Sequence, residues 1–497
     1  MPSPSGRPAY RNPGWFLVLP AVVLAGILGW AARRGGADRE GPRRVLVVAL
    51  PLEEAPLPPG ELPVLANLVK DLLETQGGRA VSLAPAPPAP EDLGGGAPAV
   101  LLTFRAGRQG AALRLRAAIR RLDGPAGAEL PGPVASPAEA LAWLVGRLPG
   151  PPVRPDQEGR LVPRAPEAFW ALLEGGAVLE DPGRAEEVMG QVRACEALAP
   201  DCASAALLRA QCLAYRAVED PLAPPGALDQ AREAFEEVLR RLPDHPRGSY
   251  LLAKLLMDAG RPREALQRTL NLRRAYPEAG PGYQALAYVG RNAGLLGLAA
   301  QGYRGLEEIT VDRRHPYRMK AGLLYLGEWE AFERSLWLTP GDPYDAVLRF
   351  HLGYLEVLRG RRPQALAHFR ALRALPGGAY PRYRALGEVF RLGLEGRTLE
   401  AMKGLSDLDR ELEGLRAPDG EFTFNLAEAY AFLGNRDLAM DLAGRAFAQG
   451  FACTRWYRES PLMASLQGLP RWEALLQALR ERQARLEAQV PAVAPAP

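Results

Sequence analysis

The sequence is poor in the side chains that most often bind metal ions. Its 497 residues include four cysteines and four histidines. No two cysteines form a CxxC pair, and the histidines lie far from them in the chain, so we expect no zinc site. The pattern favours small buried core residues, although a bridge from Cys195 to Cys202 across the turn at Pro200 is sterically feasible in an oxidising compartment. The cysteines are Cys195, Cys202, Cys212 and Cys453.

Lysine is nearly absent, and charge of one sign does not dominate. Four of the 61 basic residues are lysine and the rest are arginine, a bias that suggests a GC-rich genome. The net charge of +4 is small for this length, and arginine and glutamate alternate along expected helices, as from Arg261 to Glu264. Nucleic-acid binders usually gather basic residues on one stripe. We therefore expect no nucleic-acid partner.

The sequence also lacks recognisable catalytic motifs. The glycines at 94–96 precede an expected strand, and no GxxxxGK[ST] or GxGxxG accompanies them, so they predict a flexible turn. His351 and His368 have no adjacent serine or cysteine nucleophile, and no paired carboxylates stand out. We expect no enzyme and no cofactor; an enzymatic role would require activity that is lost when His351 or His368 is replaced.

One long uncharged run stands near the amino terminus. Residues 15–32 carry no charge and have a tryptophan near each end, which predicts a transmembrane helix after a leader at 1–14. A cleaved signal peptide is the alternative, because Arg7 and Arg11 form a basic region; against it, Trp30 lies inside the only candidate cleavage site. A buried soluble helix is a third possibility. The arginines after the run favour a cytoplasmic body, although short leaders of this kind commonly stay inside.

A small residue recurs every 34 positions in the second half of the chain. Ala231, Ala265 and Ala299 share this spacing, and glycines stand five positions before the last two. The spacing and these neighbours resemble the tetratricopeptide repeat, a helix-turn-helix unit that stacks into a superhelix. The resemblance implies about eight degenerate repeats over residues 166–450, with their small residues at Ala185, Ala231, Ala265, Ala299, Ala331, Ala365, Ala401 and Ala439.

The segments around the repeats predict a linker, a cap and a tail. Residues 149–165 are rich in proline and predict a linker. Residues 451–488 resemble the closing segment of such arrays, with Leu475, Leu479 and Leu486 on one helix face. The Pro-Ala-rich residues 489–497 predict a disordered tail.

Residues 44–148 predict a small α/β domain. Strands are expected at 45–50 and 80–83, with a helix at 62–76 between them. Strands at 99–106 and 111–122 predict a hairpin around Gly107–Gly110, with Leu113 and Leu115 on its buried face. Ser136, followed by a proline and then a glutamate at the third helical position, forms a capping box that starts a helix ending near residue 148.

This order of elements before the repeats resembles the TolB amino-terminal-like domain. The chain departs from that family because it has no clear helix between its second and third strands and no β-propeller afterwards. In bacteria the domain often precedes tetratricopeptide repeats in membrane-anchored kinases, cyclases and transcription regulators. The resemblance implies a single-pass protein of the bacterial inner membrane with its body in the periplasm. The expected fold class is mainly α, a tetratricopeptide α-solenoid preceded by a small α/β domain and one transmembrane helix.

The resemblance to tetratricopeptide repeats also implies a binding site. In that family the first helices of the units line a concave groove, and positions 5, 6, 9, 12 and 13 contact the partner. Aromatic, amide and cationic groups there suit an extended protein or peptide segment, although several aromatics are equally expected to pack between helices. The positions are Tyr250, Lys254, Gln284, Tyr288, Arg291, Asn292, Phe350, His351, Tyr354, Asn425 and Glu428.

Two functions follow from these features. The first is a membrane-anchored scaffold that holds protein partners in proximity, in envelope assembly or signalling. The second is a sensory or regulatory module related to the proteins that carry the same domain, without their effector domain. The sequence indicates no oligomeric state.

Overall fold

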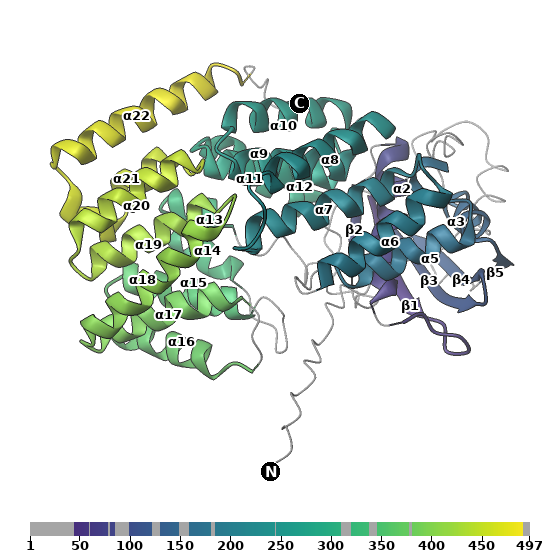
Figure 1. Ribbon diagram of the computed structural model, residues 1–497, viewed down its shortest axis with the longest axis horizontal. Helices are drawn as coiled ribbons and strands as arrows, with labels where there is room; N and C mark the ends of the chain where they lie inside the picture. The colour runs from purple at the N-terminus through teal and green to yellow at the C-terminus, as the bar shows by residue number, and fades with distance from the viewer. Residues whose placement is uncertain are drawn as a thin grey trace, which may run out of the picture.

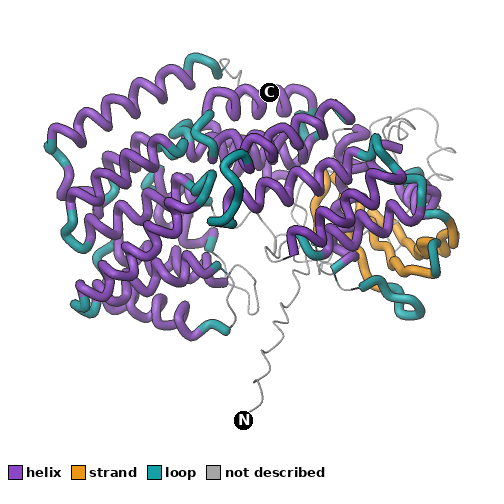
Figure 2. The backbone as a smooth tube through the Cα atoms, viewed as in Figure 1, coloured by secondary structure: helices purple, strands orange, loops and turns teal. Residues whose placement is uncertain are grey.

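The computed structural model describes residues 44–58, 60–77, 80–84, 99–121, 130–148, 159–179, 184–243, 245–309, 320–336, 345–376 and 380–490. The described chain is mainly helical, with a sheet at one end of the molecule and a long helical array beyond it (Figures 1 and 2). The expected leader, residues 1–14, lies outside the described residues, as do residues 149–158 of the linker and 491–497 of the tail.

The expected location in the inner membrane is wrong, and the described helices provide the finding. None of them is both long and apolar enough to cross a membrane, which overturns a single-pass inner-membrane protein with a periplasmic body. Residues 15–32, on which that expectation depended, lie outside the described residues.

A five-stranded sheet begins the described chain. Its strands are β1 (Arg44–Pro51), β2 (Ala80–Leu83), β3 (Ala99–Gln109), β4 (Ala112–Arg121) and β5 (Leu130–Ala135), in the order β2-β1-β3-β4-β5. β1 pairs in parallel with β2 and β3, and the remaining pairs are antiparallel. Because α2 (Glu61–Gly77) connects the parallel β1 and β2, the first part of the domain is a β-α-β unit.

Most elements of this domain lie where the sequence places them, with two differences. β5 is absent from the sequence expectation, since its two prolines and a glycine are poor strand formers. The hairpin turns at Gly110–Ala111, and Gly107 lies inside β3. A glycine is needed at this position because a Cβ there would be 2.1 Å from Ala55 O. Leu113 and Leu115 are fully buried, as expected. Ser136 forms the expected capping box at the start of α3 (Pro137–Val145).

The array consists of helices in antiparallel pairs. Within the described residues the pairs are α5 (Pro166–Ala177) with α6 (Ala185–Leu198), α7 (Ala203–Glu219) with α8 (Ala227–Arg241), α9 (Pro246–Asp258) with α10 (Pro262–Ala275), and α11 (Gly280–Asn292) with α12 (Leu296–Ile309). They continue with α13 (Ala321–Tyr325) and α14 (Trp329–Ser335), α15 (Asp345–Leu358) and α16 (Arg362–Ala374), α17 (Pro381–Leu394) and α18 (Thr398–Gly414), and α19 (Gly420–Phe432) and α20 (Arg436–Ala448).

The repeating alanines and glycines explain these pairs. Each of the eight alanines lies in the second helix of a described pair, and six of them are fully buried, whereas Ala185 and Ala331 are half-buried in looser units. In six of the described units the glycine before the alanine adopts a positive φ, as at Gly260 with φ 69°. There Arg261 N–H donates to Leu256 O across the end of α9. Glycine ends the first helix of the unit because other residues rarely adopt this conformation.

The array bends until late units meet early ones. Between α20 and α21 (Thr454–Glu459), Ala452 N–H donates to Asn292 O at the end of α11 over 2.6 Å. The backbones approach so closely that a Cβ at Gly260 would lie 2.4 Å from Ala448 O. We call this contact between residues 257–292 and residues 421–452 the seam. Figure 1 shows α20 and α21 beside α11 at this place.

The last helix strengthens the seam. α22 (Pro470–Glu487) lies on α20 and reaches back to α10. Arg482 stacks on the Phe447 ring at 3.6 Å and donates to Phe447 O over 2.7 Å. Leu486 is buried in the same core cluster as α9 and α11. The helix therefore covers the last unit and also reaches the third helix pair, α9 with α10.

The sheet and the first helices share one hydrophobic core. Leu161 and Val162, from the expected linker, are buried in a cluster that also holds residues of β1, α2, α5 and α7. Trp170 Nε1 of α5 donates to Ala111 O at the tip of the β3–β4 hairpin over 3.1 Å. The α/β domain is therefore packed directly on the array.

Candidate partner-binding face

The candidate residues on α9 and α11 form two parallel rows. Tyr250 and Lys254 stand one turn apart on α9, and Gln284 and Tyr288 stand one turn apart on α11. Tyr250, Lys254 and Gln284 are partly exposed, whereas Tyr288 is buried. The α11 row therefore runs from a partly exposed residue to a buried one, whereas both residues of the α9 row are partly exposed.

Polar and ionic contacts fix the side chains at the buried end of these rows. Lys254 Nζ lies 2.6 Å from Asp258 Oδ2 and 4.8 Å from the centre of the Tyr288 ring, and the Tyr288 hydroxyl donates to Asp258. Burial, together with the charge of Asp258, raises the pKa of Tyr288 well above its usual range. Asn292 Nδ2 donates to Tyr288 O over 3.0 Å. This corner is consequently held in one arrangement.

Arg291 carries the strongest contact across the seam. Its Nη2 donates to Glu421 Oε2 of α19 over 2.7 Å, and both side chains are largely buried. The Tyr325 hydroxyl of α13 donates to the other oxygen of Glu421. Burial raises the pKa of Glu421, and Arg291 opposes that shift. Arg291 thus binds a residue of its own chain four repeats away.

The candidates on α15 are buried among aromatic rings. Phe350 stacks with Tyr354 at a centroid distance of 5.9 Å and lies 5.3 Å from Tyr383 of α17. His351 Nδ1 is 2.7 Å from Val347 O. Burial lowers the pKa of His351 to about 4, so the ring is neutral at pH 7. His368 on α16 is half-buried, and burial lowers its pKa as well.

The candidates on α19 form a buried polar cluster. Glu428 is fully buried and accepts hydrogen bonds from Asn425 Nδ2 at 3.3 Å and from Ser460 Oγ at 2.5 Å. The Tyr354 hydroxyl of α15 donates to the same carboxylate. Burial raises the pKa of Glu428 to about 7, although these donors favour its charged form. The cluster joins α15 and α19 to the segment after α21.

The eleven candidates therefore fall into two groups. Tyr250, Lys254 and Gln284 are partly exposed, and the other eight are buried in contacts within the chain. Their part in partner binding stays a prediction.

Two residues that contact the candidates are absent from the predicted set. Tyr383 and Glu421 both occupy the second position of their units, at the start of the first helix, where they point into the closed interior. The signal that would have found them is this shared position, because a tightly bent array brings the helix starts together as well as the helix centres.

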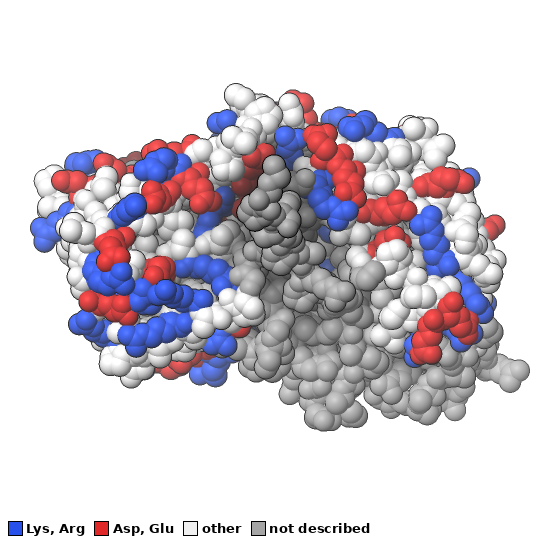
Figure 3. Space-filling view, turned by 60° about the horizontal axis from the view of Figure 1, so that its bottom comes forward, with Lys and Arg blue, Asp and Glu red and all other residues white. Residues whose placement is uncertain are grey.

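The surface carries charges of both signs. Figure 3 shows arginine, lysine, aspartate and glutamate interspersed over the described part of one face. Many of them form short ion pairs, such as Arg261 with Glu264 at 2.6 Å. In the described residues no group of histidine, cysteine, aspartate and glutamate is arranged to hold a metal ion.

Comparison with known proteins matches part of the array to a repeat family. Residues 225–287 match the tetratricopeptide repeat family. The match spans α8, α9, α10 and most of α11, and so includes Tyr250, Lys254 and Gln284. No curated protein sequence matches the chain.

Two solved structures are similar to the chain at low identity. One is the crystal structure of the APC/C hetero-tetramer Cut9–Hcn1, at 12% identity and a TM-score of 0.40, covering 71% of this chain and 65% of that chain. The other is the crystal structure of the P58(IPK) TPR domain, at 13% identity and a TM-score of 0.18, covering 66% of this chain and 99% of that chain. This chain thus spans less than two-thirds of the first of them.

The helical pairs and the family match support a tetratricopeptide repeat protein. Such repeats form scaffolds for protein–protein interaction and are typically non-catalytic.

Proposed function

We propose that the chain binds an extended segment of a protein partner through Tyr250, Lys254 and Gln284. The observation that supports this site is that these three candidates are partly exposed and also lie within the repeat-family match. We call them the α9–α11 patch.

The chemistry of the α9–α11 patch suits a peptide. The Tyr250 ring offers an apolar wall, and the Gln284 amide offers a donor and an acceptor for a peptide backbone. Lys254 is held by Asp258 and the Tyr288 ring, so its ammonium group loses little further freedom when a partner binds. Of the buried candidates, Tyr288, Arg291 and Asn292 take part indirectly, by fixing α9 and α11 in place.

Replacement of exposed patch residues tests this function. A partner captured with the wild-type protein should be lost by Tyr250→Ala combined with Gln284→Ala. A matched control is Gln267→Ala with Asn271→Ala, because these residues of α10 are exposed and their amides are hydrogen-bonded to each other. Unchanged binding by the patch variant would sink the assignment, and equal loss in both variants would point to a general defect.

A second function, a regulatory module, is favoured by the contact between α2 and the array. Arg247 Nη1 at the start of α9 lies 3.3 Å from Asp71 Oδ2, a carboxylate that is almost fully buried. In this proposal residues 44–148, which resemble the TolB amino-terminal-like domain, form a sensory unit. That unit alters the position of α9 through this contact.

The two functions differ in the effect of breaking that contact. Asp71→Asn leaves the α9–α11 patch unchanged, so a simple scaffold should keep its affinity for the partner. A regulatory module should show an altered affinity while remaining folded by circular dichroism.

A further inference from the structure

Cys195 and Cys202 lie where the α/β domain packs on the first helices of the array. Cys195 lies in the last turn of α6 and Cys202 caps the start of α7. Both side chains are buried, with exposed fractions of 0% and 1%, in the core that the sheet shares with the first helices.

The turn between the two helices brings these residues together. Ala199 N–H donates to Cys195 O over 2.8 Å, and Cys202 N–H donates to Ala199 O over 3.1 Å. The backbone of Ala199 is therefore hydrogen-bonded to both cysteines. These two bonds fix the cysteine backbones on either side of one tight turn.

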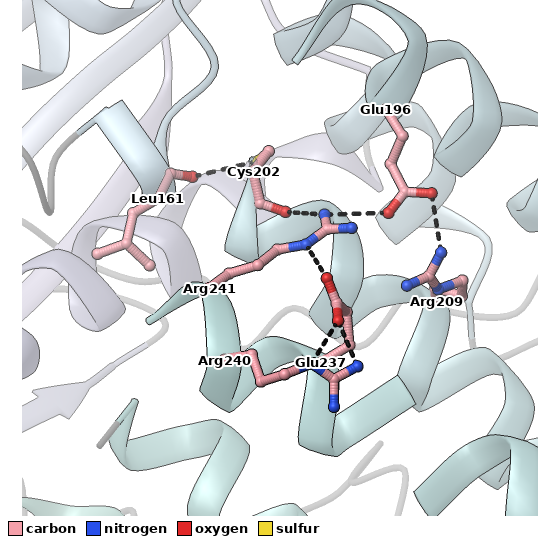
Figure 4. A network of polar contacts seen from close by, with 7 residues as sticks. All are labelled: Leu161, Glu196, Cys202, Arg209, Glu237, Arg240 and Arg241. Carbon is pink, nitrogen blue, oxygen red and sulfur yellow. Dashed lines mark hydrogen bonds and ion pairs between the residues drawn. The ribbon is translucent and has the colours of Figure 1, made fainter. Parts of the chain in front are cut away.

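A guanidinium group holds the same two helix ends from outside the turn. Arg241 Nη1 lies 3.0 Å from Cys202 O and 3.1 Å from Oε1 of Glu196, the residue after Cys195 (Figure 4). Because a single nitrogen atom contacts both segments, they cannot be far apart. The two thiols also influence each other, because Cys202 raises the pKa of Cys195 and Cys195 lowers the pKa of Cys202.

The two sulfurs have different chemical characters. The thiol of Cys195, the first backbone N–H groups of α7 at Ser204 and Ala205, and the charge of Arg241 together lower the pKa of Cys202, although its burial opposes them. The same contact raises the pKa of Cys195. Cys202 is the better nucleophile, and Cys195 is placed to attack it next.

We propose that Cys195 and Cys202 are a disulfide site that closes the α6–α7 turn when the chain meets a low-molecular-weight disulfide. The Cys202 thiolate attacks one sulfur of the oxidant, breaks its S–S bond and releases one thiolate. Cys195 then loses its proton, attacks the Cys202 sulfur of the mixed disulfide and releases the second thiolate. Two protein thiols lose two electrons and two protons, and the oxidant is reduced to two thiols.

The bridge would fasten the array where the α/β domain joins it. In the reduced protein the Cys202 thiol is within 3.9 Å of Leu161 O, on the segment that enters α5. The disulfide removes that contact and ties α6 directly to α7. The bond stabilises the folded state because it restricts the unfolded chain, so the oxidised chain loses less conformational entropy on folding than the reduced chain does.

The other two cysteines provide the comparison. Cys212 Sγ is within 3.7 Å of Ala185 O, and burial raises the pKa of Cys453 to about 12. A Cys212→Ala, Cys453→Ala variant keeps the proposed pair alone, and Cys195→Ala removes one partner.

Oxidative refolding tests the site without depending on access to the buried pair. The reduced, unfolded full-length chain is refolded with reduced and oxidised glutathione, and its thiols are then blocked. Digestion after Glu196 or before Asp201 separates the two cysteines, so a bridge appears as a reducible pair of peptides. We expect this pair in the wild type and in the Cys212→Ala, Cys453→Ala variant, with two of the four wild-type thiols lost.

The oxidised wild type should also melt at a higher temperature than the reduced wild type, whereas Cys195→Ala should show no such redox difference. The proposal is overturned if the folded protein keeps all four thiols, if another pair of cysteines is linked instead, or if Cys195 and Cys202 are linked to the same extent in denaturant.

Discussion

Two buried carboxylates have contrasting surroundings. One is Glu421 at the seam, and the other is Glu74 where α2 of the α/β domain packs on the array, a contact that we call the α2 junction. Glu421 is bound by the Arg291 guanidinium and the Tyr325 hydroxyl, which come from two other helices. Glu74 lies on α2 near the start of α11, and neither of its oxygens makes a well-formed hydrogen bond within the described residues. Its nearest cation, Lys70 Nζ, is 3.7 Å away.

The two carboxylates therefore have different effects on the segments that they join. A buried charge with full partners holds two segments together, whereas a buried carboxyl without them favours its neutral form. Burial raises the pKa of Glu74 to about 8, since Lys70 and the start of α11 offset it only in part. The seam is therefore a fixed closure, and the junction between the α/β domain and the array depends on pH.

Removing the cation of the seam should have the largest effect. Arg291→Ala leaves the Glu421 carboxylate buried without its partner and should lower the free energy of unfolding by about 3–5 kcal/mol. Denaturant unfolding measures this change. Arg261→Ala is the control, because its exposed pair with Glu264 should contribute less than about 1 kcal/mol. Similar losses in the two variants would contradict a special role for the seam.

Two glycines with the same conformation test whether the seam is closed. Gly260→Ala and Gly434→Ala both place alanine at a positive φ, which costs about 1 kcal/mol. At Gly260 the new Cβ also meets Ala448 O, whereas nothing lies within 4 Å at Gly434. Gly260→Ala should therefore lose about 1–3 kcal/mol more in denaturant unfolding. Equal losses would mean that the two backbones do not touch.

Glu74 at the α2 junction should make the stability of the protein depend on pH. The pKa of Glu74 rises from an ordinary 4.5 to about 8 in the folded protein, so its contribution to stability is complete below pH 4.5 and is lost as pH rises through 8. Glu74→Gln lacks this loss and should gain about 1–3 kcal/mol over wild type between pH 5 and pH 8. Urea unfolding across that range measures the difference. Glu428, with a pKa of about 7, titrates in both proteins and cancels. A constant difference at all pH values would refute the prediction.

A single hydroxyl in the buried cluster should have the smallest effect. Tyr354→Phe removes one of the three hydrogen bonds to Glu428 and should lower stability by about 1 kcal/mol. It should also raise the pKa of Glu428 above about 7, because the removed donor favours the charged form. Carbon NMR of the glutamate carboxyl follows that titration, and an unchanged pKa would contradict the assigned contact.

The local pattern of the sequence indicates the helix pairs, because each depends on neighbours in the chain. The small residue at Ala265 and the glycine five positions before it are sufficient for a turn and a close helix packing. The alternation of Leu113 and Leu115 with arginine likewise identifies a strand with one buried face.

The closure of the array was not predictable in the same way. It joins Arg291 to Glu421 across 130 residues, and neither residue has a local pattern that marks the other. The candidate positions assume an open groove, in which Glu428 would be available, whereas it accepts hydrogen bonds from Tyr354 of another unit and from Ser460 of the closing segment. The bend of a repeat array is the sum of small rotations between units, which single-unit patterns do not contain.

A double-mutant cycle between Arg291 and Glu421 tests the closed array most directly. The free energies of unfolding of wild type, Arg291→Met, Glu421→Gln and the double variant give the coupling between the two side chains. The closed array predicts a coupling of about 2 kcal/mol or more, because both groups are buried and bonded to each other. Additive losses, with a coupling near zero, would show that α11 and α19 do not meet and that the array is open.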